Sequence, residues 1–198
     1  MGQSEPAGDP DAKVEIHVVS TIDDRIKAFV IRGIVYMGDQ SCPYAEEFDG
    51  NDECATHLIA TVDGEPAGTL RIRYFGDFIK IERVAVRREY RIYNLGFRMA
   101  KYAEGIGARK GFRRVYGTIQ IRLTRYWSRI GYRPLQKARL VFSDHEYVPM
   151  VGDLPEATDP LGLDSDDLVL VRPEGDWDRP GILDLSAARG ATNPVART

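Results

Sequence analysis

A strand that runs through a basic loop directly into a helix lies at the centre of the chain. Residues 78–86 are rich in isoleucine and valine and follow a turn signal at Gly76-Asp77, so they predict a strand. In residues 95–110 the apolar side chains recur three and four positions apart, as in an amphipathic helix. The first N–H groups of a helix have no partner within it, and the helix dipole adds positive charge there. The junction therefore predicts a cradle for an anion.

The side chains of this loop strengthen that prediction. Arg87, Arg88 and Arg91 bring three positive charges to the junction. Gly96 has no side chain, so a phosphate can approach the start of the helix closely. A pyrophosphate fits these electrostatics. From these residues alone, a solvated basic turn is an equally good interpretation.

The elements on either side of the junction follow a mixed order. Periodicity predicts a strand at 13–19, a helix at 21–37, an acidic loop at 39–53, strands at 57–62, 67–74 and 78–86, a helix at 95–110, a strand at 113–120, a helix at 122–129 and a β-hairpin over 132–150. The order β-α-β-β-β-α-β-α-β-β predicts an α/β (α+β) fold, with a mixed and mostly antiparallel sheet flanked by helices.

Composition divides the chain into three parts. Residues 1–12 are rich in glycine, proline and acid, which favours a disordered N-terminus. Residues 13–150 form the domain. Residues 151–198 form an acidic, Pro/Gly-rich C-terminal extension, with one strand expected at 167–172.

The net charge of −3 hides a strong asymmetry. Residues 80–140 hold 17 Lys+Arg against 3 Asp+Glu, and both flanks are acidic. A basic middle indicates a polyanionic ligand. Alternatively, the acidic flanks pack against it within the chain or across a homodimer. No recognition helix accompanies the charge and the whole chain is acidic, which argues against nucleic acid.

Other classes of protein are disfavoured by what the sequence lacks. No apolar run is long enough to span a membrane, and the first residues lack the order of a signal peptide. We therefore expect a cytoplasmic protein with no membrane partner. Cys42 and Cys54 have no histidine at metal-ligand spacing, so we expect two reduced thiols and no metal.

Two motifs resemble those of the GNAT superfamily of N-acetyltransferases. In that family a strand leads into Arg/Gln-x-x-Gly-x-Gly/Ala at the start of a helix, which here reads Arg91-Ile92-Tyr93-Asn94-Leu95-Gly96. Residues 126–132, Tyr-Trp-Ser-Arg-Ile-Gly-Tyr, resemble the family's aromatic pair followed by Leu-Gly-Phe. Residues 32–50 resemble a small bacterial subgroup, with an outline likeness to acyl-homoserine-lactone synthases. The resemblance covers residues 13–150.

The resemblance implies acetyl-CoA or another acyl-CoA as co-substrate. By resemblance, the backbone of Val84 and Val86 would pair with the pantetheine arm like an added strand. The expected contact residues lie at the strand end, in the loop and at the helix start: Val84, Ala85, Val86, Arg87, Arg88, Arg91, Ile92, Tyr93, Asn94, Leu95, Gly96 and Phe97.

The chain departs from the family pattern at two positions. Asn94 replaces the usual middle glycine, and asparagine tolerates a positive φ better than most residues. Trp127 stands where the family often has a tyrosine that protonates the leaving thiolate. Tyr126 is our candidate for this acid, although one position along a helix turns a side chain by about 100°.

Acyl transfer to an amine also needs a base, because an amine with a pKa near 10 is mostly protonated at neutral pH. Glu82, on the strand before the cradle, is the candidate, and the resemblance implies that family members often use a carboxylate there. An ion pair of Glu82 with Arg71, Arg73 or Lys80 is an equally good interpretation.

The acidic loop, residues 39–53, is the expected wall of the acceptor site. Carboxylates there would favour a cationic amine on a small molecule or peptide. The candidate substrate residues are Tyr36, Tyr44, Glu46, Glu47 and Tyr74. The predicted function is N-acyl transfer by direct attack in a ternary complex. An enzyme like the acyl-homoserine-lactone synthases, or a non-catalytic acyl-CoA-binding regulatory module, is the alternative.

Overall fold

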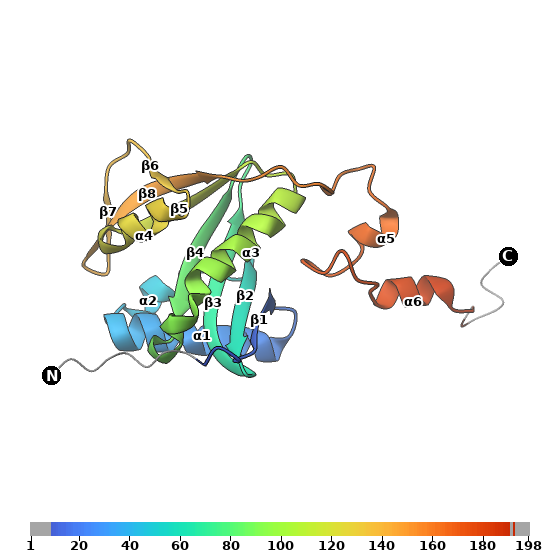
Figure 1. Ribbon diagram of the computed structural model, residues 1–198, viewed down its shortest axis with the longest axis horizontal. Helices are drawn as coiled ribbons and strands as arrows, with labels where there is room; N and C mark the ends of the chain where they lie inside the picture. Colours follow the sequence, from blue (N-terminus) through green and yellow to red (C-terminus); the bar gives the residue numbers. More distant parts are fainter. Residues whose placement is uncertain (1–8, 191, 193–198) are drawn as a thin grey trace. The chain divides into compact units, whose positions relative to one another are not determined.

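The computed structural model describes residues 9–190 and 192, and the chain forms two units, Met1–Pro160 and Leu161–Thr198. The first unit is built on one mixed sheet (Figure 1). Its path runs β1-β2-β3-β4-β5-β8-β6, with β7 also paired to β8. The strands are β1 Val14–Val18, β2 Thr56–Val62, β3 Glu65–Tyr74, β4 Ile79–Val86, β5 Arg114–Gln120, β6 Arg133–Pro134, β7 Leu140–Phe142 and β8 His145–Asp153. The expected fold class is confirmed, since only the β4–β5 pair is parallel.

The parallel pair is short. β4 and β5 pair only at Ile79–Val115 and Lys80–Tyr116. Beyond these pairs β4 stays bonded to β3, and β5 stays bonded to β8 as far as Gln120. The two halves of the sheet therefore separate towards the C-terminal end of β4, and the basic loop and the next helix begin at that end.

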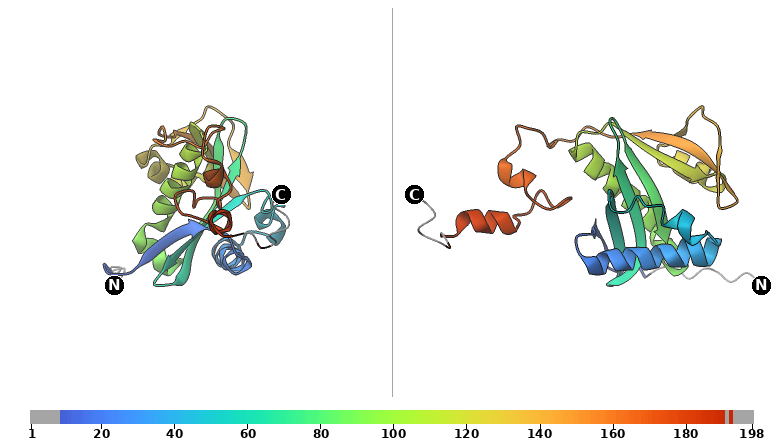
Figure 2. Two further views of the ribbon diagram at one scale, coloured as in Figure 1. Left: turned by 90° about the vertical axis from the view of Figure 1, so that its right-hand side faces the viewer. Right: turned by 180° about the vertical axis from the view of Figure 1, so that it is seen from behind.

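Helices cover the two faces of the first half of the sheet (Figures 1 and 2). On one face lie α1 Ile22–Arg32, the π-helical turn η1 Gly33–Gly38 and α2 Tyr44–Glu47. On the other lies α3 Leu95–Arg109, which packs on β3 and β4. The Thr21 hydroxyl accepts from the Asp24 N–H (3.1 Å) and caps α1.

The core forms because β2 and β3 are buried on both faces. Ile31 and Val35 pack with Ile59 and Ala85, which joins α1 and η1 to β2 and β4. On the opposite face, β3 is so close to α3 that a Cβ on Gly68 would lie 2.9 Å from the methyl carbon of Met99. A larger side chain at that glycine would push α3 off the sheet.

Several local expectations need correction. The helix expected over 21–37 changes to a π-helical turn at Gly33, and the acidic loop contains the short helix α2. A 3₁₀ helix, η2 Arg88–Tyr93, replaces the expected loop before α3. Asp9 accepts from two N–H groups in a turn over residues 9–12, where disorder was expected. The rest of the predicted disordered N-terminus, residues 1–8, lies outside the described residues.

The C-terminal boundary also differs from the expected one. β8 continues to Asp153, the Leu154 N–H then donates to the Arg113 carbonyl (2.9 Å), and the first unit ends at Pro160. The strand expected at 167–172 is wrong, since the helix α5 Asp167–Leu170 forms there. Asp166 caps α5 by accepting from the Leu168 N–H (2.8 Å).

The second unit is organised around one ion pair. Besides α5 it contains α6 Ile182–Ala188. Arg172 donates to Asp184 (2.8 Å) and to the carbonyl of Trp177 (2.6 Å), and Trp177 is buried. Asp184 also accepts from the Gly181 N–H (2.6 Å) at the start of α6. Among the described residues of both units, no helix is long and apolar enough to cross a membrane.

Two glycines of α3 offer a matched test of this packing. Gly105 is exposed and a Cβ there would meet nothing within 4 Å, whereas a Cβ on Gly107 would lie 2.7 Å from Ile79 and 3.1 Å from Leu154. Gly105→Ala should raise the free energy of unfolding by up to about 1 kcal/mol. Gly107→Ala should lower it by roughly 1–2 kcal/mol, because overpacking outweighs the gain in helix propensity. Denaturant melts measure both, and an equal stabilisation by the two variants would contradict this packing.

Candidate active site

A cleft of about 970 Å³ opens where β4 and β5 separate. η1, β4, η2, the start of α3, β5, α4 Thr124–Arg129 and the β7–β8 hairpin contribute to its walls. Many of the residues singled out from the sequence line it: Tyr36, Glu46, Glu47, Glu82, Val84, Val86, Arg88, Arg91, Asn94, Leu95, Gly96 and Tyr126. Other singled-out residues do not line it: Tyr44, Tyr74, Ala85, Arg87, Ile92, Tyr93 and Phe97.

A β-bulge shapes the β4 side of the cleft. Arg71 of β3 pairs with Glu82, but Thr69 pairs with Ala85, so the register shifts by one residue between these pairs. Arg83 in the bulge adopts a φ of 53°, which is uncommon for a residue other than glycine. The bulge frees the Val84 carbonyl, and that carbonyl accepts from the Tyr36 hydroxyl (2.9 Å). Burial raises the pKa of Tyr36, so its hydroxyl stays a donor at neutral pH.

The residues of the predicted anion cradle form part of the cleft wall. Asn94 caps α3 with φ 54° and ψ 34°, the left-handed conformation expected from the asparagine at this position. Arg88 and Arg91 line the cleft beside it. Arg91 also lies 3.6 Å from Asp39. A Cβ on Gly96 would lie only 3.9 Å from Val84 and 4.0 Å from the Tyr126 hydroxyl, so a larger residue would narrow the cradle.

The Tyr126 hydroxyl belongs to the same cradle. It donates to the Asn94 side chain (3.2 Å). Burial raises the pKa of Tyr126, so the group is protonated at neutral pH. Trp127 is buried and packs edge-on against Tyr132 (centroids 4.9 Å apart).

Arg87 does not take part in the cradle. It donates to the Pro66 carbonyl (2.8 Å) and to Glu89 (2.7 Å), and its guanidinium lies over the ring of Tyr90. These partners hold its charge away from the cleft. The cradle therefore has two arginines where the sequence indicated three.

Glu82 makes the ion pairs that one of the two interpretations of the sequence predicted. Its carboxylate accepts from Arg71 (2.9 Å) and lies near Lys80 (3.4 Å) and Arg73 (3.7 Å), so the ion pair exists. Glu82 also lines the cleft, and its Oε1 is buried without a hydrogen bond. That oxygen, which lies 3.7 Å from Arg73, keeps acceptor capacity beside the cleft.

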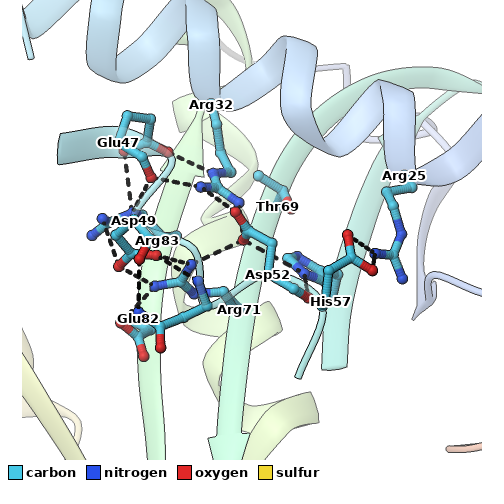
Figure 3. Close-up of polar contacts among 12 residues, drawn as sticks. Arg25, Arg32, Glu47, Asp49, Asp52, His57, Thr69, Arg71, Glu82 and Arg83 are labelled. Atoms are coloured by element: carbon cyan, nitrogen blue, oxygen red, sulfur yellow. Dashed lines mark hydrogen bonds and ion pairs between the residues drawn. The ribbon is translucent and has the colours of Figure 1, made fainter. Parts of the chain in front are cut away.

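Arginines and carboxylates pair in a buried cluster next to the cleft (Figure 3). Arg32 donates to the Glu47 and Asp52 carboxylates, and Arg71 donates to Asp49 (2.8 Å) and Asp52 (2.9 Å). Both arginines are 0% exposed. Removing one partner of a buried ion pair leaves an uncompensated charge, which costs about 3–5 kcal/mol. The cluster thus fixes the acidic loop against α1 and β3.

The bulge is tied to the same loop through Arg83. Its guanidinium donates to the Glu46 carbonyl (2.7 Å) and to the Asp49 carboxylate (3.1 Å). Burial alone would raise the pKa of Asp49, but the hydrogen bond and charge of Arg71 lower it well below its usual range. Asp49 therefore stays ionised and keeps both arginines in place.

The acidic loop does not act as a set of free carboxylates. Glu47 and Asp49 are paired with arginines, and Glu46 accepts from the backbone and hydroxyl of Ser143 (3.0 and 2.6 Å). The expectation that this loop attracts a cationic acceptor therefore loses its main support. Of the predicted pocket tyrosines, Tyr36 supports the bulge. Tyr44 is 67% exposed and packs at a tilt against Phe48, and Tyr74 stacks on Phe112.

Sequence reasoning missed a polar group at the end of β5. Gln120 is 7% exposed and bonds to Gln40, Arg122 and Tyr147, and all four residues line the cleft. Gln120 ends a predicted strand, but nothing in the sequence connects it to a residue 80 positions away. In the described part of the chain, no group of three or more His, Cys, Asp or Glu is arranged to hold a metal ion.

Comparisons with known proteins agree with this geometry. The model of the acetyltransferase (GNAT) family matches residues 24–132, more than half of the chain. A candidate acetyltransferase of Bacillus subtilis is 29% identical over 124 residues, covering 61% of this chain and 84% of that protein. The chain belongs to the GNAT acetyltransferase family. At the general level, members of this family transfer an acyl group from an acyl-CoA to an amine.

Solved structures show the same fold. An acyl-CoA N-acyltransferase from Pseudomonas aeruginosa superposes with a TM-score of 0.64 at 23% identity, over 71% of this chain and 99% of that one. An aminoglycoside 6'-N-acetyltransferase, solved with coenzyme A bound, superposes with a TM-score of 0.58 at 12% identity, over 73% of this chain and 99% of that one.

The buried cluster predicts a pH dependence of stability. His57 is 2% exposed and bonds to the Asp52 carbonyl (3.1 Å), and burial lowers its pKa. The unfolded chain therefore takes up a proton below about pH 6.5 that the folded chain refuses. Between about pH 7.5 and 5.5, the free energy of unfolding should fall by about 1 kcal/mol on this account. Denaturant melts of His57→Gln should show a smaller fall, and those of His145→Gln on the exposed hairpin should match the wild type.

Proposed function

We propose that this chain moves an acetyl or other short acyl group from an acyl-CoA to a primary amine, by direct attack in a ternary complex. One observation carries the proposal: a single cleft joins an anion cradle at the start of α3 to a carboxylate oxygen of Glu82 that lacks a hydrogen bond. The first feature suits the phosphates of CoA, and the second suits an amine that must lose a proton.

The cradle fits CoA in charge and in shape. The first-turn N–H groups of α3, with Arg88 and Arg91, would hold the pyrophosphate. Gly96 leaves this place open, and the edge of β4 that has left β5 is free to pair with the amides of the pantetheine arm. In this arrangement the thioester lies near the bulge, whose backbone Tyr36 holds in place.

The reaction then needs two proton movements. The amine nitrogen attacks the thioester carbonyl carbon, a C–N bond forms and the C–S bond breaks. The proton lost by the amine passes to Glu82, directly or through water. The thiolate leaves and takes a proton from Tyr126, whose hydroxyl must first turn away from Asn94. Tyr126 is protonated at neutral pH, as an acid must be.

A non-catalytic acyl-CoA-binding role is the second candidate. The side chain of Asn94 occupies the cradle where the family has glycine, and three cations surround Glu82. Both features would suit a protein that binds an acyl-CoA without turning it over. The two candidates share the co-substrate and differ only in whether an amine is acylated.

A thermal-shift titration tests the shared part. Acetyl-CoA and CoA should each stabilise the protein, whereas ATP should not. A ligand at 100 times its Kd adds about 2.7 kcal/mol, or roughly 5–10 °C for a chain of this size. The control is Gly96→Leu, which should lose the shift because its side chain enters the cradle. Absence of any shift with all CoA species in the wild type would refute both candidates.

Replacing Glu82 tests the catalytic part. Glu82→Gln should lower kcat/KM for the acceptor amine roughly 10²- to 10³-fold near neutral pH, with little change in CoA affinity. The loss should shrink at high pH, where the amine is already deprotonated. Glu65→Gln, on the exposed start of β3, is the control and should behave as wild type. A loss that does not vary with pH would mean that Glu82 only balances the charge of Arg71.

A further inference from the structure

Gln120 organises one wall of the cleft by contacting three residues from distant parts of the chain. Its side chain bonds to Gln40 at the end of the η1 region, to Arg122 in the 3₁₀ turn η3 Ile121–Leu123, and to Tyr147 of β8. Gln120 is 7% exposed, whereas each partner reaches the same cleft. The direction of these bonds determines what the wall offers to a ligand.

Arg122 fixes that direction. A guanidinium can only donate, so Arg122 Nε donates to the Gln120 Oε1 (2.7 Å), which must be the acceptor. The Gln120 Nε2 therefore donates its two hydrogens, one to the Gln40 Oε1 (2.9 Å) and one to the Tyr147 oxygen (3.1 Å). No other assignment of the two glutamine amides satisfies all three bonds.

These bonds leave several hydrogens free for a ligand. Gln40 keeps its NH₂ and Tyr147 keeps its own O–H, while each of their oxygens, which already accepts from Gln120, keeps one lone pair. The terminal nitrogens of Arg122 have no hydrogen bond or ion pair with the described residues. One wall of the cleft thus presents an amide, a hydroxyl and a guanidinium, each able to donate and one of them charged.

The carboxylates that share the cleft are already paired. Asp39 lies 3.6 Å from Arg91, Glu46 is bonded to Ser143, Glu47 and Asp49 belong to the arginine cluster, and Glu82 pairs with Arg71. None of them is bonded to this wall. A ligand group that fits it must supply acceptors and negative charge, which an oxyanion does.

We propose that the acceptor amine carries an oxyanion, a carboxylate or a phosphate, which Arg122, Gln40 and Tyr147 bind. This proposal rests on the proposed acyl transfer. It assigns the substrate class to amino acids and amine phosphates, in place of the polyamines that an acidic loop would attract. Binding the oxyanion at this wall leaves the amine end of the same molecule within the cleft that contains Glu82.

The test compares ligands that differ only in the oxyanion. Isothermal titration measures the binding of α- and β-amino acids against their carboxamides, and of phosphoethanolamine against ethanolamine, with and without saturating CoA. CoA cannot acylate, so the measurement needs no turnover. The variants are Arg122→Met, Tyr147→Phe and the control Arg125→Met, an exposed arginine of α4 that does not line the cleft.

At least one oxyanion should bind more tightly than its neutral partner. Arg122→Met should weaken that ligand roughly 10- to 100-fold and leave its neutral partner unchanged, because a charge-assisted bond is lost. Tyr147→Phe should weaken it by a smaller factor, and Arg125→Met should not.

The proposal is overturned if no oxyanion in the panel is preferred, or if Arg122→Met weakens both members of a pair equally. It is also overturned if that variant weakens only CoA, which would place the donor wall on the pantetheine arm. If CoA does not bind the wild type, the proposed function is refuted. The titrations without CoA measure the oxyanion preference separately, so the two failures can be distinguished.

Discussion

The guanidinium of Arg71 is the group on which the site depends. It is fully buried, and it donates to Asp49, Asp52 and Glu82, which come from the acidic loop and from β4. Burial alone would lower the pKa of Arg71, but its carboxylate partners outweigh this effect and the net shift is upward. A charge in this position is tolerable only while all its partners are present. The need to neutralise the charge of Arg71 therefore helps to position the acidic loop, the bulged strand β4 and Glu82.

The bulge in β4 and the short β4–β5 pairing both leave backbone groups of β4 without a partner in the sheet. β4 leaves β5 after two pairs, so its later backbone groups need other partners or a ligand. Tyr36 supplies one by donating to Val84, and Arg83 anchors the bulge to the acidic loop. The β4 side of the cleft is thus held by contacts from η1 and the acidic loop, and a fixed backbone there would help to position a thioester for attack by an amine.

The sequence was most informative where the physics is local. The left-handed Asn94 and the strand–helix junction depend on neighbours in the chain, and both were predicted. Long-range partners were not predictable. The loop's carboxylates were expected to attract a cationic amine, because nothing local in the sequence shows their arginine partners. The strand expected at 167–172 was wrong because Asp166 caps a helix there. Composition showed a basic middle, but it could not show that Arg87 faces away from the cleft.

Pairing within the acidic loop also changes what the cleft can recognise. A surface rich in Asp and Glu suggests affinity for cations, but carboxylates already bonded to arginines contribute little to a ligand. Among the described arginines that line the cleft, Arg88 and Arg122 are the two with no carboxylate partner. Arg88 suits the phosphates of CoA, and Arg122 suits an anion on the acceptor. With these anions held by arginines, Glu82 is the carboxylate that the proposed mechanism leaves for the amine.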